Sequence, residues 1–348
     1  MKKTIISVLV LLIAFSFANA QGDDNVVVVG GQEAEMAYNK GLQHFSANEY
    51  DKAITEFSNA IKLNDKFEKA YYNRGSVRLE KKDYIGAITD FSKAIELNPS
   101  MEKAFFSRGY AKVNLQKYDE AILDFNTAVE HGYAEANVYY YKGVAQFQLE
   151  TYEAAEISFT QAIEINKEYV YAYNDRGSTY RKLKKNQKAL EDYNTAISLE
   201  SKFAFIFNNR GSLKRQMEDY EGAVKDYDAA IKLDDSYVIA YNNRGRAKFK
   251  LEDYEGAIAD FQKATELDKT YAYAYNNLGT AKMKLEDFNG AIKAFDQAIE
   301  ISPEYGFAYV NRGSAKEMLR DFDGACRDWK RGVELGVKSA EAYLESCN

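Results

Sequence analysis

The sequence predicts an all-α solenoid of nine tandem two-helix units, and three periodic features support this fold class. A glycine recurs every 34 residues, nine times in succession, from Gly41 to Gly313. An alanine follows each glycine after twelve residues, and an aromatic residue follows after sixteen. The residues around these positions are spaced by three and four, which places their side chains on one face of a helix. Each unit is therefore expected to be a helical hairpin.

The first helix of each unit carries the glycine, and the second carries the aromatic residue between two small residues. A glycine inside a helix costs about 1 kcal/mol relative to alanine. Its recurrence therefore indicates a close contact between the two helices at that point. In the second unit we expect Gly75 to meet Ala87, with the rings of Tyr71 and Phe91 filling the space around them.

Short polar segments such as Lys82-Asp83-Tyr84 separate the two helices, and their aspartate is a suitable N-cap for the second helix. The chain is therefore divided into a leader, a linker, nine repeats and a short capping helix. The expected boundaries are 1–20, 21–33, then 34–67, 68–101, 102–135, 136–169, 170–203, 204–237, 238–271, 272–305 and 306–339, and finally 340–348.

Two segments carry a family resemblance, Ala70-Tyr71-Tyr72-Asn73-Arg74-Gly75 and the run from Ala87 to Pro99. They resemble the tetratricopeptide repeat (TPR), and the resemblance extends from Ala34 to Ser339. It implies a right-handed α-solenoid of about one superhelical turn whose inner groove binds extended peptides. Two positions depart from the family pattern. The residue before the glycine is mostly arginine, and the residue three after it is often basic, as at Arg78, Lys248 and Lys282.

The N-terminus has the order of a secretory signal peptide. Lys2 and Lys3 precede an apolar run, and Ala18-Asn19-Ala20 follows it. Cleavage after Ala20 would leave 44 basic and 53 acidic side chains, a net charge of −9. No cysteine near the cut offers a lipid-attachment site, and no second apolar stretch reaches membrane length. We therefore expect a bacterial protein exported to the periplasm or the exterior that does not bind nucleic acid. An uncleaved membrane anchor is the alternative.

Two cysteines are present, Cys326 on the second helix of the last repeat and Cys347 in the final segment. An exported protein can form a disulfide between them, which would hold the capping segment in place. Two buried free thiols are the alternative.

A charge pattern accompanies the repeat. Six units have arginine directly before the glycine, and the same six have aspartate fifteen residues after it. We predict bidentate ion pairs between the two helices of each of these units, because an arginine beside a packing glycine needs a counter-charge. Alternatively, both residues face water. The predicted pairs are Arg74–Asp90, Arg108–Asp124, Arg176–Asp192, Arg210–Asp226, Arg244–Asp260 and Arg312–Asp328.

The opposite face of the first helices is rich in amides, rings and cations. Amides can bond to a peptide backbone, and cations favour an acidic peptide or a terminal carboxylate. A solvated polar face of copied units is the alternative. The predicted groove contains Asn39, Asn73, Asn174, Asp175, Asn208, Asn209, Asn242, Asn243, Asn276, Asn277 and Asn311, the rings of Tyr171, Phe205, Tyr273 and Phe307, and the cations Arg181, Lys182, Arg215, Arg246, Lys250 and Lys284.

The sequence offers no pattern for catalysis. Its two histidines, His44 and His131, are far apart and have no zinc-ligand spacing. There is no phosphate-binding loop and no nucleophile elbow. We therefore expect no enzyme activity, no metal and no cofactor.

The leading hypothesis is an exported, non-enzymatic scaffold that binds peptide or protein segments with acidic groups in its groove. One alternative is a glycan-binding envelope protein that uses the aromatic row. Another is a structural subunit of a cell-envelope assembly, joined through the ends of the repeat array. The sequence leaves the partner and the oligomeric state open.

Overall fold

The computed structural model describes residues 29–347, and this part of the chain is helical throughout. It forms two compact units that divide between Lys185 and Asn186.

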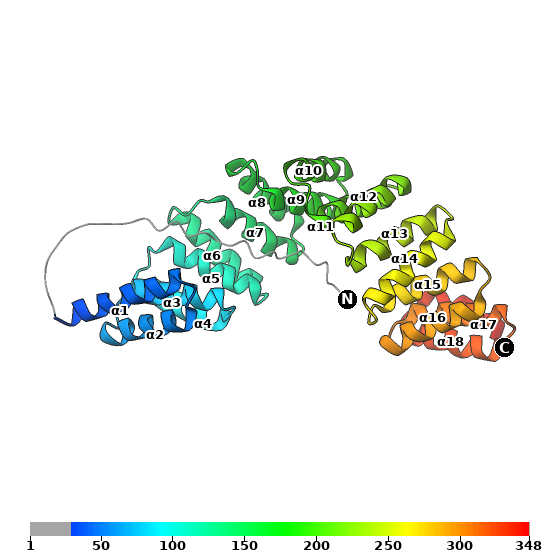
Figure 1. Ribbon diagram of the computed structural model, residues 1–348. Coiled ribbons are helices and arrows are strands. Elements are labelled where there is room, and N and C mark those ends of the chain that lie inside the picture. The colour runs from blue at the N-terminus through cyan, green and yellow to red at the C-terminus, as the bar shows by residue number, and fades with distance from the viewer. Residues whose placement is uncertain (1–28, 348) are drawn as a thin grey trace. The chain divides into compact units, whose positions relative to one another are not determined.

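Within residues 29–185, the first unit contains nine helices that follow one another in chain order (Figure 1). Consecutive helices pack as antiparallel hairpins, and each hairpin packs on the next. The helices are α1 (Val29–Ser46), α2 (Tyr50–Leu63), α3 (Glu68–Glu80), α4 (Tyr84–Leu97), α5 (Glu102–Asn114), α6 (Tyr118–Glu130), α7 (Ala136–Gln148), α8 (Tyr152–Ile165) and α9 (Val170–Lys182).

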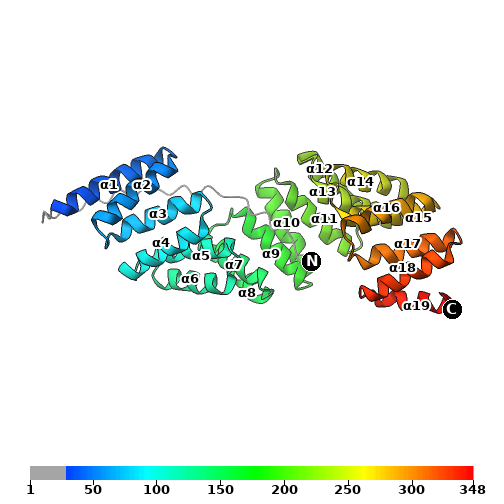
Figure 2. The same ribbon diagram turned by 90° about the horizontal axis from the view of Figure 1, so that it is seen from below.

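The second unit repeats this arrangement and ends in a short helical segment beside α18 (Figure 2). Its helices are α10 (Asn186–Leu199), α11 (Ala204–Gln216), α12 (Tyr220–Leu233), α13 (Val238–Lys250), α14 (Tyr254–Leu267), α15 (Ala272–Lys284), α16 (Phe288–Ile301), α17 (Gly306–Met318), α18 (Phe322–Glu334) and α19 (Glu341–Leu344). The 3-10 turns η1 (Lys338–Ala340) and η2 (Glu345–Cys347) flank α19.

The predicted fold class is confirmed as an all-helical tandem array of helix-turn-helix repeats with a short C-terminal helix. The right-handed sense of the solenoid and its single superhelical turn depend on both units together, and they stay predictions.

The repeat glycine makes room for the aromatic ring sixteen residues later. A Cβ atom added to Gly245 would lie 2.8 Å from Phe261, and one added to Gly279 would lie 2.5 Å from Phe295. These separations are shorter than carbon atoms tolerate, so any larger residue would push the two helices apart. Both rings are almost completely buried. The ring, more than the alanine expected at Ala87 and its equivalents, is the group that presses on the glycine.

The turn within each hairpin has two fixed features. One non-glycine residue with positive φ recurs seven positions after the repeat glycine, as at Lys82 and Glu252. The aspartate that follows caps the second helix in five hairpins by accepting a hydrogen bond from a glycine N–H, as predicted. These caps are Asp83, Asp219, Asp253, Asp287 and Asp321.

At the N-terminus, α1 begins at Val29, inside the segment 21–33 that was expected to be a linker. The predicted signal peptide 1–20 and residues 21–28 lie outside the described residues. No helix in residues 29–347 combines the length and the apolar character that crossing a bilayer requires.

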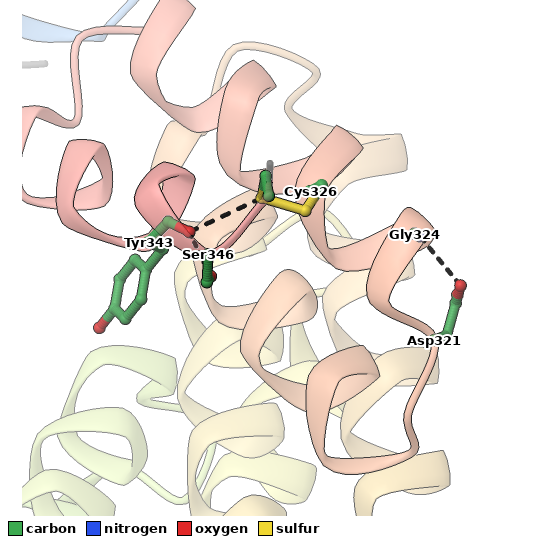
Figure 3. Close-up of a disulfide and its surroundings, with 6 residues drawn as sticks. Asp321, Gly324, Cys326, Tyr343 and Ser346 are labelled. Carbon is green, nitrogen blue, oxygen red and sulfur yellow. Dashed lines mark hydrogen bonds between the residues drawn. A yellow bond between two sulfur atoms is a disulfide. The ribbon is translucent and has the colours of Figure 1, made fainter.

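At the C-terminus, a disulfide joins Cys326 on α18 to Cys347, at a sequence separation of 21 and with 5.7 Å between their Cα atoms (Figure 3). It holds the final segment against α18, where the ring of Tyr343 stacks on Trp329 with 5.1 Å between ring centroids. Val337 and Ala340 complete this small apolar cluster. The tethered segment covers part of the surface of α18 that would otherwise be exposed.

Candidate functional site

Buried aspartates on the second helices hold the hairpins together. In the second repeat, Arg74 donates from Nε to Asp90 Oδ2 at 3.0 Å and from Nη2 to Oδ1 at 2.7 Å. The same bidentate geometry occurs in Arg108–Asp124, Arg210–Asp226, Arg244–Asp260 and Arg312–Asp328. These aspartates are buried, so they do not face water. The sixth pair, Arg176–Asp192, stays a prediction.

Each of these aspartates also has a second cation, which the sequence analysis did not assign to it. Lys248, three residues after the repeat glycine, places Nζ 2.9 Å from Asp260 Oδ2. The equivalent residues Arg78, Lys112, Lys214 and Lys316 contact their aspartates at 2.8–2.9 Å. The basic residue that departs from the family pattern is therefore a counter-charge for the buried carboxylate.

The arginine also connects neighbouring repeats. Nη1 of Arg244 donates to Asp228 at 2.6 Å, and Asp228 lies on the second helix of the preceding repeat. The equivalent acceptors are Ser58, Ser92, Thr160, Asn194 and Asp296. The guanidinium groups of Arg74, Arg108, Arg210, Arg244 and Arg312 therefore bond to two successive second helices. The polar residue seventeen after each glycine is the sequence signal that could have indicated this contact.

The hydrogen bonds are strong enough to affect the ionisation of the arginine. Hydrogen bonding to Asp328 raises the pKa of the Arg312 guanidinium above its ordinary value, although burial opposes this shift. An aromatic ring lies on the other side of each guanidinium, as Tyr309 does 5.4 Å from Arg312. The guanidinium groups of these arginines therefore make their contacts within the protein itself.

Two repeats have an uncharged residue in place of the buried aspartate. In repeat eight, Leu278 and Ala294 occupy the two positions and are buried, while Lys282 contacts Asp287 at 2.9 Å instead. In repeat four, Ser158 takes the aspartate position and donates a 2.7 Å hydrogen bond to Gln146, whereas Lys142 takes the arginine position. The repeat can therefore be built without the ion pair when a small uncharged residue replaces the aspartate.

The asparagine pairs hydrogen-bond to each other across neighbouring repeats. Asn277 Nδ2 donates to Asn242 Oδ1 at 2.9 Å, and Asn243 and Asn311 donate in the same way to Asn208 and Asn276. Asn208, Asn242 and Asn276, the first member of each pair, are buried. Their assignment to the groove is therefore wrong: they belong to the packing between repeats. The second members stay partly exposed.

Asp175 takes the second position of such a pair in repeat five. It accepts hydrogen bonds from Tyr140 at 2.9 Å and from Asn174 at 2.8 Å. It is buried, and desolvation raises its pKa to about 6 although both hydrogen bonds oppose the shift. Asn174 and Asp175 are therefore not groove residues either. In repeat two, Asn73 donates to Tyr38 at 2.7 Å in the equivalent place.

A basic pocket of about 120 Å³ lies on the first helices of repeats six to eight. Arg215 projects from α11, Arg246 and Lys250 from α13, and Asn277 from α15. These four residues were predicted for the groove, and the structure brings them together. Phe249, Phe261 and Thr280 also line the pocket and were not predicted. Thr280 directly follows a repeat glycine, as Arg246 does, so the 34-residue period could have predicted that Thr280 lies beside the other pocket residues.

The three cations of the basic pocket have no acidic partner within ion-pair distance among the described residues. Desolvation, followed by the like charge of Arg215, lowers the pKa of the Arg246 guanidinium from its ordinary value. Arginine stays protonated at neutral pH despite such a shift. The pocket therefore concentrates positive charge on a chain whose net charge is −7.

An aromatic strip lies near the basic pocket. The ring centroids of Tyr273 and Tyr305 are 4.9 Å apart, and Tyr271 and Phe307 extend the row. Tyr273 is 42% exposed and Phe307 is 57% exposed. The phenols of Tyr271 and Tyr305 are close enough to influence the ionisation of Arg246. Apolar rings next to unpaired cations suit a ligand with both kinds of group.

The other predicted groove residues are more scattered. Lys182 lies over the ring of Tyr152, which is on the neighbouring helix α8. Asn39 is exposed on α1, Lys284 is exposed on α15, and Arg181 is partly buried on α9. Tyr171 packs against an aromatic cluster of the first unit, and Phe205 contacts Phe203. No group of histidine, cysteine or acidic side chains within residues 29–347 is arranged to hold a metal ion.

Comparison with known proteins identifies the family. Sequence profiles described as TPR repeat match residues 41–82, 211–252 and 245–286. Profiles described as tetratricopeptide repeat match 68–101, 106–169, 170–203 and 272–305. Together these segments cover more than half of the chain, which therefore belongs to the TPR family, a family of protein- and peptide-binding scaffolds that are generally not catalytic.

Solved structures share the fold. A TPR protein from Parabacteroides merdae is 19% identical, with a TM-score of 0.57 over 73% of this chain and 100% of its own. The Cut9–Hcn1 hetero-tetramer of the APC/C is 16% identical, with a TM-score of 0.57 over 90% of this chain and 75% of the other. YrrB, described as a TPR protein with an unusual peptide-binding site, is 24% identical, with a TM-score of 0.47 over 53% and 95%. No curated protein matches the chain.

The charge network predicts an asymmetry between single and double substitutions. Asp260→Ala leaves Arg244 and Lys248 without their buried counter-charge and is expected to lower the free energy of unfolding by about 3 kcal/mol. Adding Arg244→Leu copies Leu278 and Ala294 of repeat eight and is expected to recover all but about 1 kcal/mol of that loss. Urea unfolding followed by circular dichroism measures both. Equal losses in the two variants would contradict the account.

The buried Asp175 predicts a pH-dependent stability. Its pKa is higher in the folded than in the unfolded chain, so its ionisation destabilises the fold as the pH rises through about 6. Asp175→Asn is expected to raise the free energy of unfolding by about 2–3 kcal/mol at about pH 7.5, and by almost nothing near pH 4. Thermal unfolding across this range tests it. The exposed Asp235→Asn is the control, since it changes the net charge equally. A gain independent of pH would refute the explanation.

Proposed function

We propose that this TPR protein is an exported scaffold that binds extended acidic segments of a partner protein, and that the basic pocket anchors them. The observation that carries the proposal is the presence of three cations, Arg215, Arg246 and Lys250, in one pocket without ion-pair partners. Cations left unpaired in a partly desolvated pocket repel one another, and an acidic ligand relieves the repulsion.

The contrast with the structural cations supports this assignment. Arg244 and Lys248 lie on the same helix as Arg246 and Lys250, and both contact Asp260. The two sets differ in direction because the positions share a helix but not a face. One set stabilises the hairpin, and the other is available to a ligand.

The amides suit an extended peptide. Asn277 uses one N–H to bond to Asn242, and within residues 29–347 its Oδ1 accepts no hydrogen bond. This oxygen can accept from a peptide N–H next to the basic pocket, and the Thr280 hydroxyl, which donates its proton to the backbone carbonyl of Asn276 at 2.9 Å, can accept as well. The exposed rings of Tyr273 and Phe307 offer apolar contacts to side chains of the same segment.

Two features support export. The N-terminal segment 1–20 has the composition of a signal peptide. The only two cysteines of the chain form a disulfide, a bond that is rare in proteins of reducing compartments.

The test compares two fluorescein-labelled ten-residue peptides, one with four glutamates and one with glutamines in their place. By fluorescence anisotropy, the glutamate peptide should bind at least about 10-fold more tightly at about 50 mM NaCl and weaken as the salt concentration rises. Arg246→Ala should weaken it by about 10-fold, or about 1.4 kcal/mol. Lys225→Ala, an exposed lysine of α12 outside the pocket, should leave the affinity unchanged.

Equal affinity for the two peptides, or no effect of Arg246→Ala, would refute acidic-segment binding at this site. Binding of a soluble polysaccharide that survives high salt and is lost in Tyr273→Ala would favour the glycan-binding alternative. Defined oligomers in size-exclusion chromatography without ligand would favour a structural subunit.

A further inference from the structure

The basic pocket has more positive charge than one carboxylate can neutralise. Arg215, Arg246 and Lys250 contribute three positive charges, and no acidic side chain lines the pocket. A single aspartate, glutamate or terminal carboxylate would leave two of them unbalanced. We infer that the pocket accepts a dianionic phosphoryl group carried by the bound segment, an inference that rests on the proposed function.

The donors approach from three helices. Arg215 comes from α11, Arg246 and Lys250 from α13, and the second N–H of the Asn277 amide from α15. A phosphoryl group has three terminal oxygens that point in different directions, whereas both oxygens of a carboxylate lie in one plane. A surrounding set of donors therefore fits the tetrahedral group better. Guanidinium groups also match phosphate oxygens with two parallel hydrogen bonds.

One buried atom of Arg215, its Nε, also favours an anionic ligand. Its Nε is buried and has no acceptor among the described residues. A buried donor without an acceptor is costly, and an anionic oxygen is the strongest acceptor available to it.

The apolar walls of the basic pocket strengthen the attraction between its cations and an anionic ligand. Phe249 and Phe261 line the pocket together with the cations, and Phe261 is almost completely buried. Apolar walls reduce the local dielectric, so attraction between the cations and a dianion is stronger than at an open surface. The repulsion between Arg215 and Arg246 is relieved most by a ligand with two negative charges.

The experiment uses the full chain without its leader and three otherwise identical ten-residue peptides with serine, glutamate or phosphoserine at the centre. The phosphoserine peptide should bind at least about 10-fold more tightly than the glutamate peptide, and inorganic phosphate should compete. Its affinity should fall between about pH 7.5 and 5, because the phosphoryl group gains its second proton near pH 6. The affinity of the glutamate peptide should change little in this window, since glutamate titrates near pH 4.3.

Arg215→Ala and Arg246→Ala should each abolish most of the preference for phosphoserine, whereas Lys225→Ala should preserve it. Arg215→Lys keeps the charge but not the paired donors, and it should give an intermediate preference. Unchanged circular dichroism and melting temperature would show that each variant is folded.

Equal affinities for the glutamate and phosphoserine peptides would overturn the phosphoryl inference while leaving acidic-segment binding intact. A preference that survives both arginine variants would also overturn it, because the group would then bind elsewhere. Inorganic phosphate binding as tightly as the phosphoserine peptide would show that the site takes the free anion rather than a peptide. If none of the three peptides bound, the proposed function itself would fail.

Discussion

The architecture depends on a buried aspartate that must be neutralised. In five repeats this carboxylate lies on the second helix and receives two cations from the first, one directly before the glycine and one three residues after it. The contact fixes the register of the hairpin, and the third donor of the arginine extends it to the preceding repeat. The glycine beneath the ring permits the close approach that these short bonds require. Backbone packing and charge neutralisation thus reinforce each other.

Much of this could be predicted from the sequence, because a 34-residue period determines which positions face each other within a hairpin. Arg74 and Asp90 change together with their equivalents, and that covariation within one chain identified the pair. The role of Lys248 and the contact of Arg244 with Asp228 were missed because each aspartate was given one partner only. The buried asparagines were misassigned for a related reason. A helix face that is free in one hairpin can be covered by the next hairpin, and only the stacking of the repeats shows which amides remain exposed.

The same helices therefore have two kinds of cation. The cations beside the aspartates form ion pairs within the hairpins. Arg215, Arg246 and Lys250 form no ion pair with the described residues. The separation follows from helical geometry, since positions one, four and five after the glycine lie on a different helix face from the positions that contact the aspartate. In the proposed function, the binding site lies on repeats six to eight of the second unit. This division of roles explains how an acidic chain can present a basic site.

The most direct test of this division is NMR of the arginine side chains in 15N-labelled protein, titrated with an acidic peptide. Arg244 and Arg246 are two residues apart on α13 and provide the sharpest comparison. The account predicts that the Nε proton of Arg244 exchanges slowly with water and does not shift, whereas the Nε resonances of Arg215 and Arg246 shift as peptide is added. Fast exchange at Arg244 together with unmoved resonances at Arg215 and Arg246 would contradict it.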